Sequence, residues 1–268
     1  MTLLQLLVLA LVQGITEFLP ISSSGHLILI PLLADWPDQG LALDVAVHVG
    51  TLLAVMLYFW RDMIAMLLGL LNLLRGRRTD GARLVAMILV ATLPVLIAGF
   101  LLQRAGMMQE LRSVLVIGWA TLVFGILLWL ADWLGMTIRR VEHMSLGAAL
   151  FIGCAQVLAL VPGTSRAGVT MTAARIMGFE RDDTARFSML LSIPTILAAG
   201  ALAGLDLAES GDSQLGFSAI LAALLAFGAA LLSIWGLMWW LRRATYAPFV
   251  VYRVLLGAGL LAWGYGLL

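Results

Sequence analysis

The sequence contains no lysine, a single cysteine and few charged residues. All sixteen of its basic residues are arginine, which excludes Schiff-base chemistry and lysine-dependent phosphate motifs. The single cysteine, Cys154, cannot form an internal disulfide, and its apolar neighbours predict a packed thiol. Charged residues make up only 12% of the chain and the net charge is +1, so no nucleic-acid partner is expected.

Apolar residues, in contrast, are abundant. They make up 62% of the 268 residues, whereas a soluble domain is about half apolar and about a quarter charged. One soluble core cannot bury so much apolar surface. The composition therefore predicts a polytopic membrane protein, in which function must be sought among the polar residues that lie inside apolar segments.

The apolar segments fall into two kinds. A helix needs about 20 apolar residues to span a bilayer. Six stretches meet this length, namely 41–60, 84–102, 113–131, 187–204, 217–241 and 248–268. Two further apolar regions, 3–34 and 146–177, are interrupted by polar clusters at 20–25 and 162–168. Irregular backbone inside a membrane needs protein or water to satisfy its polar groups, so both regions are predicted to be re-entrant helical hairpins.

The order of these segments predicts an all-α membrane protein of six transmembrane helices and two re-entrant hairpins. Each half, approximately 1–131 and 146–268, contains one hairpin and three spans, so the single membrane domain is an inverted repeat. The polar turns of the two hairpins are then expected to meet near the middle of the membrane. The stretch 63–74 is too short to span and is expected to lie along the interface.

Charge placement predicts the orientation. The basic loops fall on one face of this arrangement, and basic loops stay in the cytoplasm. The opposite face receives the acidic residues Asp35, Asp38, Asp206, Glu209 and Asp212. The first hairpin then enters from the outer face. The N-terminus lacks a basic region, so no removable signal peptide is expected, and the predicted location is a bacterial inner membrane.

The first hairpin carries an acidic residue at membrane depth. Gln13 and Glu17 lie one helical turn apart on one face. A carboxylate in an apolar helix is costly and faces a partner or a cavity. Glu17 could cap or tether the hairpin, but the functional interpretation is favoured. Its roles would be divalent-metal ligand, with Gln13 as a neutral co-ligand, or proton acceptor.

The polar turn after Glu17 combines hydroxyl groups with an imidazole. Ser22, Ser23 and Ser24 precede a helix expected to begin near Gly25, so one of them is expected to be an N-cap. His26 follows at the start of that helix. A histidine beside a hydroxyl and a carboxylate is an arrangement that activates a nucleophile. The sequence leaves three nucleophiles open: Ser23, His26 and water.

The second hairpin provides the opposite charge. Thr164, Ser165 and Arg166 stand where a new helix starts, and Thr170 follows one turn later. Hydroxyls, amide groups at a helix N-terminus and a guanidinium form an anion site, for which a phosphate is the best ligand. The simpler alternative is that Arg166 serves only as the counter-ion of Glu17.

Other polar residues in apolar segments have weaker assignments. Arg175 is expected to extend its side chain toward the cytoplasmic interface, and Arg253 to lie at an interface. Asp44 and His48 lie four residues apart in the span at 41–60. They could contribute a carboxylate or a supporting partner to the site, or only anchor the outer end of the span, and the sequence favours neither.

Two motifs together resemble a known family. The sequence QGITEFLPISSSGH at 13–26 and the sequence PGTSRAGVT at 162–170 resemble those of the bacterial undecaprenyl-pyrophosphate phosphatases. The resemblance extends over the whole chain in length, span number and motif spacing. It implies a phosphatase that removes the terminal phosphate of undecaprenyl pyrophosphate at the outer, periplasmic face. It also implies recycling of this carrier lipid for peptidoglycan synthesis, and resistance to bacitracin.

The resemblance also assigns roles to residues. Glu17 resembles the essential acidic residue, Ser23 and His26 the catalytic hydroxyl and imidazole, and Arg166 the phosphate-binding arginine. Further candidates for binding the substrate phosphates are Ser22, Ser24, Thr164, Ser165 and Thr170. The family implies a divalent metal, Mg²⁺ or Ca²⁺. Many members have a second glutamate where this chain has Gln13, so metal binding is assigned to Glu17 with Gln13 as a neutral ligand.

A second class of function remains open from the sequence. Inverted repeats with broken helices are also the architecture of transporters, so a polyprenyl-phosphate flippase is the alternative. The expected partners are undecaprenyl pyrophosphate and membrane lipid, and the oligomeric state is left open, a homodimer included.

Overall fold

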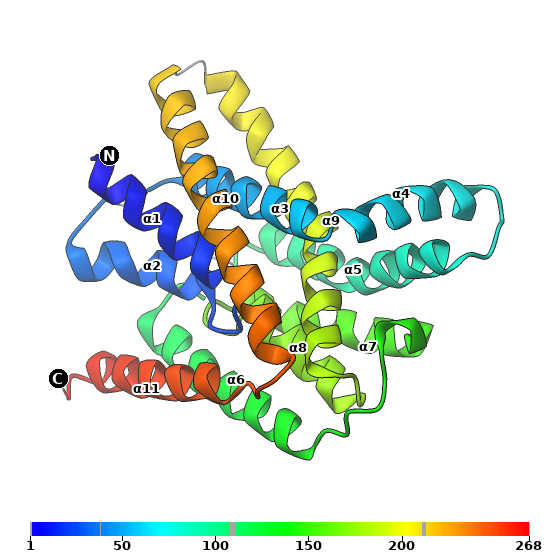
Figure 1. Cartoon of the computed structure of the whole chain (residues 1–268). Helices are drawn as coiled ribbons and strands as arrows, with labels where there is room; N and C mark the ends of the chain where they lie inside the picture. Colours follow the sequence, from blue (N-terminus) through cyan, green and yellow to red (C-terminus); the bar gives the residue numbers. More distant parts are fainter. Residues whose placement is uncertain (1, 38, 108–110, 211–212, 268) are drawn as a thin grey trace.

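The chain folds into helices joined by short loops (Figure 1). The computed structural model describes residues 2–37, 39–107, 111–210 and 213–267, and within these ranges it contains no strand. The all-α prediction is therefore confirmed. The long helices are α3 (Leu41–Tyr58), α4 (Trp60–Leu74), α5 (Asp80–Arg104), α6 (Val114–Leu134), α9 (Arg181–Ser210), α10 (Ser213–Leu241) and α11 (Ala247–Gly264). The shorter ones are α1 (Leu3–Thr16), α2 (Ser23–Ala34), α7 (Leu146–Val157), α8 (Arg166–Ile176) and the 3₁₀ turns η1 (Val141–His143) and η2 (Leu158–Leu160).

Several of these helices are long and apolar enough to cross a membrane, and the protein is a multi-pass membrane protein. Four helices of the described chain have the required length and composition: α5, α6, α11 and residues 216–241 of α10. They coincide with four of the predicted spans, those at 84–102, 113–131, 217–241 and 248–268. The span predicted at 41–60 ends early, because α3 and α4 meet at a bend of 89° beside Phe59. The bent pair would make a fifth span.

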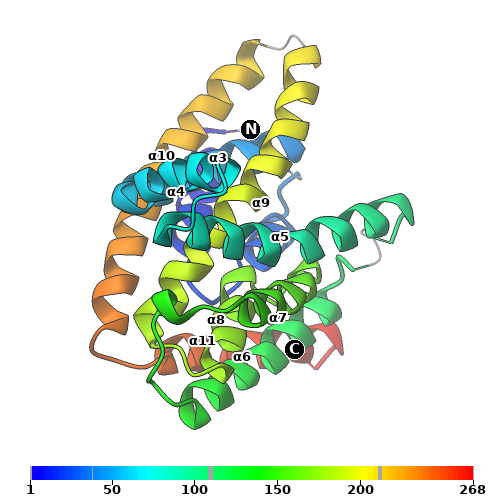
Figure 2. The same cartoon turned by 90° about the vertical axis from the view of Figure 1, so that its right-hand side faces the viewer.

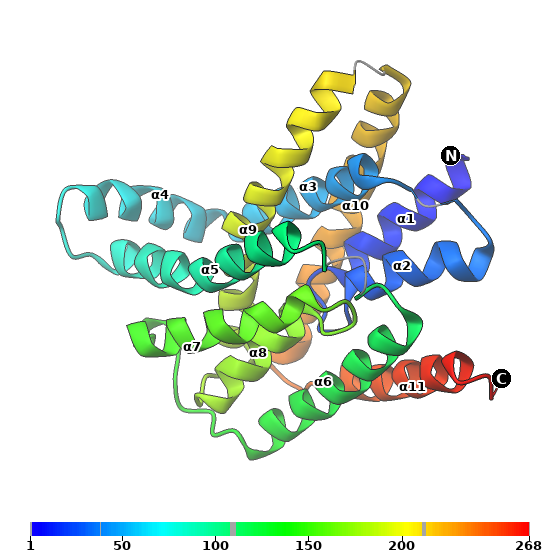
Figure 3. The ribbon, with the colours of Figure 1, turned by 180° about the vertical axis from the view of Figure 1, so that it is seen from behind.

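The two regions predicted to be hairpins are pairs of short helices. The pair α1 and α2 contains 14 and 12 residues, and the pair α7 and α8 contains 12 and 11. The turn between α1 and α2 and the N-terminal end of α8 both lie in the middle of the molecule (Figures 1 and 3). Chain segments about 140 residues apart in sequence thus come together there, as expected from the sequence.

Both short-helix pairs start their second helix in the same way. Ser22 precedes α2 with φ 72°, and Ser165 precedes α8 with φ 70°. Each serine hydroxyl accepts a hydrogen bond from the amide of the glycine three residues on, Gly25 or Gly168. A non-glycine residue with positive φ costs about 1 kcal/mol or more, and the capping bond offsets part of that cost. The expected serine N-cap is therefore present, and it is Ser22.

Helix α10 is the surface on which α1 and α3 pack. Both contacts are made through glycine, which lets helix backbones approach closely. A Cβ atom on Gly14 of α1 would lie 2.7 Å from the carbonyl oxygen of Ala226, and one on Gly50 of α3 would lie 2.1 Å from that of Ala223. In Figure 2, α9 and α10 extend toward the top of the view, and α3, which packs on both of them, crosses between them. The spacing of α1 and α3 is thus set by small residues.

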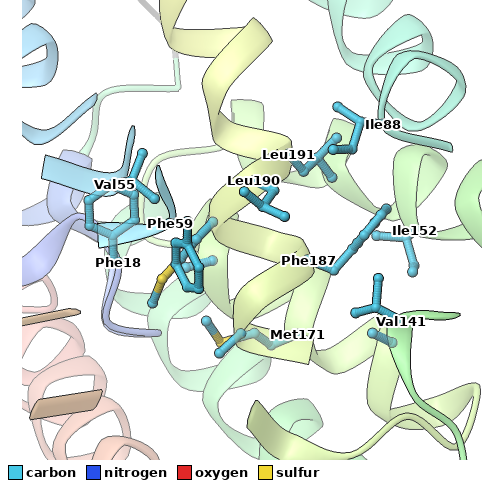
Figure 4. Packing of buried hydrophobic residues seen from close by; sticks show 14 of the residues in the cluster. Phe18, Val55, Phe59, Ile88, Val141, Ile152, Met171, Phe187, Leu190 and Leu191 are labelled. Atoms are coloured by element: carbon cyan, nitrogen blue, oxygen red, sulfur yellow. The ribbon is translucent and has the colours of Figure 1, made fainter. Parts of the chain in front are cut away.

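A large apolar cluster surrounds the ends of these helices. Phe18, directly after α1, is fully buried and belongs to the same cluster as Val55 and Phe59 at the end of α3. Figure 4 shows these three side chains together, and Phe187 and Ile152 farther along the cluster. The cluster holds the turn that follows α1 against α3 and α9.

Two predictions from the sequence, one for Arg175 and one for Cys154, are wrong. Arg175 does not extend toward an interface: its side chain is fully buried, with bonds to the carboxylate of Asp132 and to the carbonyl of Gly135. Its guanidinium is instead paired within the protein, which satisfies the buried charge. Cys154 is exposed rather than packed, because it lies on the outward face of α7 while Gly153 and Gln156 face inward.

Part of the predicted acidic face cannot be compared with the structure. Asp38 and Asp212 lie outside the described residues, as do the side chains of Asp206 and Glu209.

Replacing Gly50 with alanine tests the close contact of α3 with α10. The added Cβ would lie 2.1 Å from the carbonyl oxygen of Ala223, so the helices must separate. We expect the free energy of unfolding in detergent to fall by about 1–3 kcal/mol. The matched change Gly228→Ala on α10, where a Cβ meets nothing within 4 Å, should be neutral or stabilise by up to about 1 kcal/mol. Thermal unfolding followed by circular dichroism compares them, and equal effects would contradict this packing.

Candidate active site

The site is built around the carboxylate of Glu17, which follows the last residue of α1 and is 6% exposed. Its Oε2 atom accepts hydrogen bonds from Gln13 Nε2 at 2.8 Å and from Ser23 Oγ at 2.7 Å. Its Oε1 atom accepts one from Arg166 Nη2 at 2.9 Å. The predicted approach of the two polar turns is therefore realised as a direct ion pair between an acid of the first and a guanidinium of the second.

Arg166 is the first residue of α8, and its side chain is 15% exposed. Besides Glu17, its guanidinium donates through Nη1 to the carbonyl of Ser188 on α9, at 3.1 Å. These two bonds fix the plane of the guanidinium. Arg166 is thus the counter-ion of Glu17, as the simpler alternative predicted. The same guanidinium can also bind an anion, because the ion pair does not use all of its N–H donors.

A cavity of about 390 Å³ opens beside this ion pair. Its charged and polar lining residues are Glu17, Ser23, Ser24, Asp44, His48, Ser165, Arg166 and Thr195. The remaining lining residues are Val45, Ala159, Ile196 and Gly200. The cavity therefore offers both charged or hydroxyl groups and aliphatic groups, which fits a ligand with a polar head and an apolar tail.

The ends of two helices add fixed partial charges. Glu17 lies at the C-terminal end of α1, where free carbonyls favour a cation, and Arg166 lies at the N-terminal end of α8, where free amides favour an anion. A cation and a phosphate group could therefore be held side by side, the cation near Glu17 and the phosphate near Arg166.

The other predicted phosphate-binding residues divide into two groups. Ser24 and Ser165 line the cavity. Ser22 and Thr170 are buried and hydrogen-bonded within the protein: Ser22 caps α2, and Thr170 bonds to the hydroxyl of Ser188 at 2.7 Å. Thr164 is fully buried, and its hydroxyl has no partner in the described structure. Only the first group is placed to touch a ligand in this cavity.

His26 is directed away from Glu17. Its Nε2 atom lies 2.5 Å from the hydroxyl of Tyr252 on α11, against which the imidazole stacks, and its Nδ1 atom lies 2.7 Å from the carbonyl of Ser22. His26 is not among the described residues that line the cavity. The imidazole that lies near Glu17 is a different one, that of His48, with 3.7 Å between Nε2 and Oε2.

The position predicted for Arg253, at an interface, is wrong. It is fully buried rather than interfacial. Its guanidinium donates to the carbonyl of Pro20 in the first turn at 3.0 Å, and to those of Gly163 and Thr164 in the second at 3.1 and 2.9 Å. A further contact reaches the carbonyl of Thr121 on α6. One side chain thus joins both turns and satisfies backbone groups that lack helical partners.

A second group of acids lies away from this cavity. Glu180, Asp182 and Asp183 at the start of α9 have carboxylate oxygens within 4.8 Å of one another. Burial and the neighbouring Asp182 raise the pKa of Asp183 to about 6. Glu180 pairs with Arg140. Acids in the first turn are stabilised by the helix N-terminus, which accounts for the group without a ligand.

Arg253→Met tests whether this side chain holds the two turns. The apolar replacement leaves the carbonyls of Pro20 and Thr164 buried without donors, at about 1–3 kcal/mol each, whereas the carbonyl of Gly163 keeps the hydroxyl of Thr121. We expect the unfolding free energy in detergent to fall by several kcal/mol and the hydrogen exchange of residues 18–22 and 161–165 to rise. Arg242→Met, at an exposed arginine, is the control. Unchanged exchange at both turns would show that Arg253 does not hold them.

The whole chain is similar to known proteins. Residues 6–259 match the family model described as "Bacitracin resistance protein BacA". The chain is 56% identical to "Undecaprenyl-diphosphatase 1" of Rhodospirillum rubrum, over 99% of this chain and 96% of that protein. It is 52% and 50% identical to proteins named "Undecaprenyl-diphosphatase" of Ruegeria pomeroyi and Roseobacter denitrificans, over 99% of this chain and 100% of each relative. The chain belongs to the bacitracin resistance protein BacA family.

Proposed function

We propose that this protein hydrolyses undecaprenyl pyrophosphate to undecaprenyl phosphate and inorganic phosphate, and thereby recycles a carrier lipid for peptidoglycan synthesis and supports bacitracin resistance. The observation that carries the proposal is the 2.9 Å contact between Glu17 and Arg166 at the edge of a cavity that also contains hydroxyl groups. The names of relatives at 50–56% identity support the substrate and the reaction.

Substrate binding would begin at Arg166. A planar guanidinium binds a phosphate through two parallel hydrogen bonds. Because Arg166 Nη2 is engaged by Glu17, the arriving phosphate competes with the carboxylate for this atom. The exchange frees Glu17 Oε1 at the moment the phosphate is seated. The apolar residues Val45 and Ile196 on the cavity wall suit the start of the isoprenoid chain.

Glu17 would then act as the proton acceptor. The attacking hydroxyl is that of Ser23, which already donates to Oε2 at 2.7 Å, or a water in its place. As its oxygen bonds to the terminal phosphorus, its proton passes to Glu17, and the bond to the bridging oxygen breaks. Charge on the leaving lipid phosphate is stabilised by Arg166 and by the amides at the start of α8. If Ser23 attacks, water then cleaves the phosphoserine.

The oxygen atoms around Glu17 fit a divalent metal. Gln13 contacts the carboxylate of Glu17 through Nε2, and Ser23 contacts it through its hydroxyl. Gln13 Oε1 is buried without a hydrogen-bond partner in the described structure, and rotation of the side-chain amide would turn this oxygen toward Glu17. Oxygen ligands of this kind are preferred by Mg²⁺ and Ca²⁺. A metal bound there would neutralise charge on the pyrophosphate. Gln13, Glu17 and Ser23 are the residues we propose to hold it.

The membrane arrangement is part of the proposal. The short helix pairs α1–α2 and α7–α8 would be re-entrant hairpins, and α3, α5, α6, α9, α10 and α11 the six spans, arranged as an inverted repeat of 1–131 and 146–268. The interior position of the two turns supports this arrangement. In a bacterial inner membrane with the basic loops inside, the cavity faces the periplasm.

Glu17→Gln and Arg166→Ala test the catalytic assignment. We expect each to reduce phosphate release from undecaprenyl pyrophosphate in detergent by about 100-fold or more, because each removes a charge used in the transition state. Glu142→Gln and Arg104→Ala, at exposed residues, should retain wild-type rates. Released phosphate is measured by a colorimetric assay, after circular dichroism has shown that each variant is folded.

Either variant releasing phosphate at the wild-type rate would remove Glu17 or Arg166 from the mechanism. Because the assay uses no sealed membrane, a wild-type protein that released no phosphate would contradict the hydrolase and favour the transporter alternative.

A further inference from the structure

His48 presents one particular nitrogen atom to the cavity. It lies on α3, and its Nδ1 atom is 2.6 Å from the carbonyl oxygen of Asp44, one helical turn earlier. A carbonyl can only accept, so Nδ1 carries the proton of that bond. In the neutral imidazole the lone pair is then on Nε2. Histidines that bind metals are held by this same kind of bond from the second ring nitrogen.

The lone pair of Nε2 faces another electron donor. Nε2 lies 3.7 Å from Glu17 Oε2, which is beyond hydrogen-bond distance. In the neutral form of His48 both atoms offer electron pairs, and a cation between them would bind both. Ligands on one metal ion with bonds of about 2.1 Å lie about 3.0–3.4 Å apart. A shift of a few tenths of an ångström would therefore let both atoms bind one cation.

The surroundings of His48 favour a cation at this point. Glu17 carries the negative charge and stands at the C-terminal end of α1. Gln13 Oε1 is buried and without a partner in the described structure, and rotation of the amide, which now directs Nε2 to Glu17, would make it a further neutral ligand. The imidazole is one-third exposed, at 32%, and lines the cavity. His26 differs in this respect, because its Nε2 atom is occupied by Tyr252.

We propose that His48 Nε2 is a nitrogen ligand of the divalent cation bound by Glu17, and that the site consequently binds first-row transition-metal ions, Mn²⁺ included, more tightly than the same site without the imidazole would. Imidazole ligands raise affinity for transition metals, whereas all-oxygen sites suit Mg²⁺ and Ca²⁺. The inference rests on the site of the proposed function and assigns that site a ligand type that an acid and an amide alone cannot supply.

Pulsed electron paramagnetic resonance of bound Mn²⁺ tests the ligand directly. Purified protein without a histidine tag is titrated with Mn²⁺ in detergent, and the echo modulation from a coordinated nitrogen is recorded. We expect the modulation in the wild type and its loss in His48→Gln, with Mn²⁺ affinity at least about 10-fold weaker. Mg²⁺ affinity, measured by competition, should change less. His26→Gln is the matched control and should retain both modulation and affinity.

A second variant does not depend on the folding of His48→Gln. In His26→Gln combined with His143→Gln, the imidazole of His48 is the only one left in the chain, and the modulation should persist. Absence of the nitrogen modulation in this double variant or in the wild type would overturn the proposal. Persistence of the modulation in His48→Gln would overturn it as well.

Phosphate release is measured on the same preparations, so the two proposals can fail separately. Nitrogen modulation in a wild-type protein that releases no phosphate would contradict the hydrolase and uphold the ligand. Phosphate release without nitrogen modulation would uphold the hydrolase and contradict the proposal that His48 is a metal ligand.

Discussion

The buried ion pair between Glu17 and Arg166 is the interaction on which the rest of the structure depends. Two charges inside an apolar protein are stable only when each has a partner and hydrogen bonds. Here the carboxylate also receives bonds from Gln13 and Ser23, and the guanidinium donates to the carbonyl of Ser188. If the two side chains separated, each would be a buried charge without a partner, at a high cost in free energy. The ion pair therefore keeps the two turns together. In the proposed mechanism a phosphate replaces the carboxylate at Arg166 without leaving that cation unpaired. The pair that stabilises the resting protein would then also prepare it for an anionic substrate.

Two structural devices bring these charges into contact. Small residues let α1 and α3 approach α10 closely, so that Glu17 and His48 come within 3.7 Å of each other. The guanidinium of Arg253 binds the backbones of both turns, through the carbonyls of Pro20 and Gly163. Irregular backbone in an apolar setting needs such internal donors. The site is therefore built on rigid elements, with the reactive side chains on short turns between them.

The fold and the core of the site were predictable because their signals are local. Polar clusters with proline and glycine inside apolar runs indicated the two turns, and a lone acid and a lone arginine in such turns indicated an ion pair or a phosphate site. The partners of Arg175, Arg253 and His26 were not predictable. Each binds residues of another helix or the backbone of a loop, and such contacts depend on how helices cross rather than on any pattern along the chain. His48 stayed undecided for the same reason, since its distance from Glu17 is set by the packing of α1 and α3 on α10.

The central claim is that a pyrophosphate takes the place of Glu17 at Arg166. An experimental structure with a non-hydrolysable methylene analogue of an isoprenoid pyrophosphate tests it most directly. The account predicts the terminal phosphonate within hydrogen-bond distance of the Arg166 guanidinium and beside Ser23 Oγ, with the contact between Glu17 and Arg166 opened. An analogue bound elsewhere, with that contact intact, would contradict it.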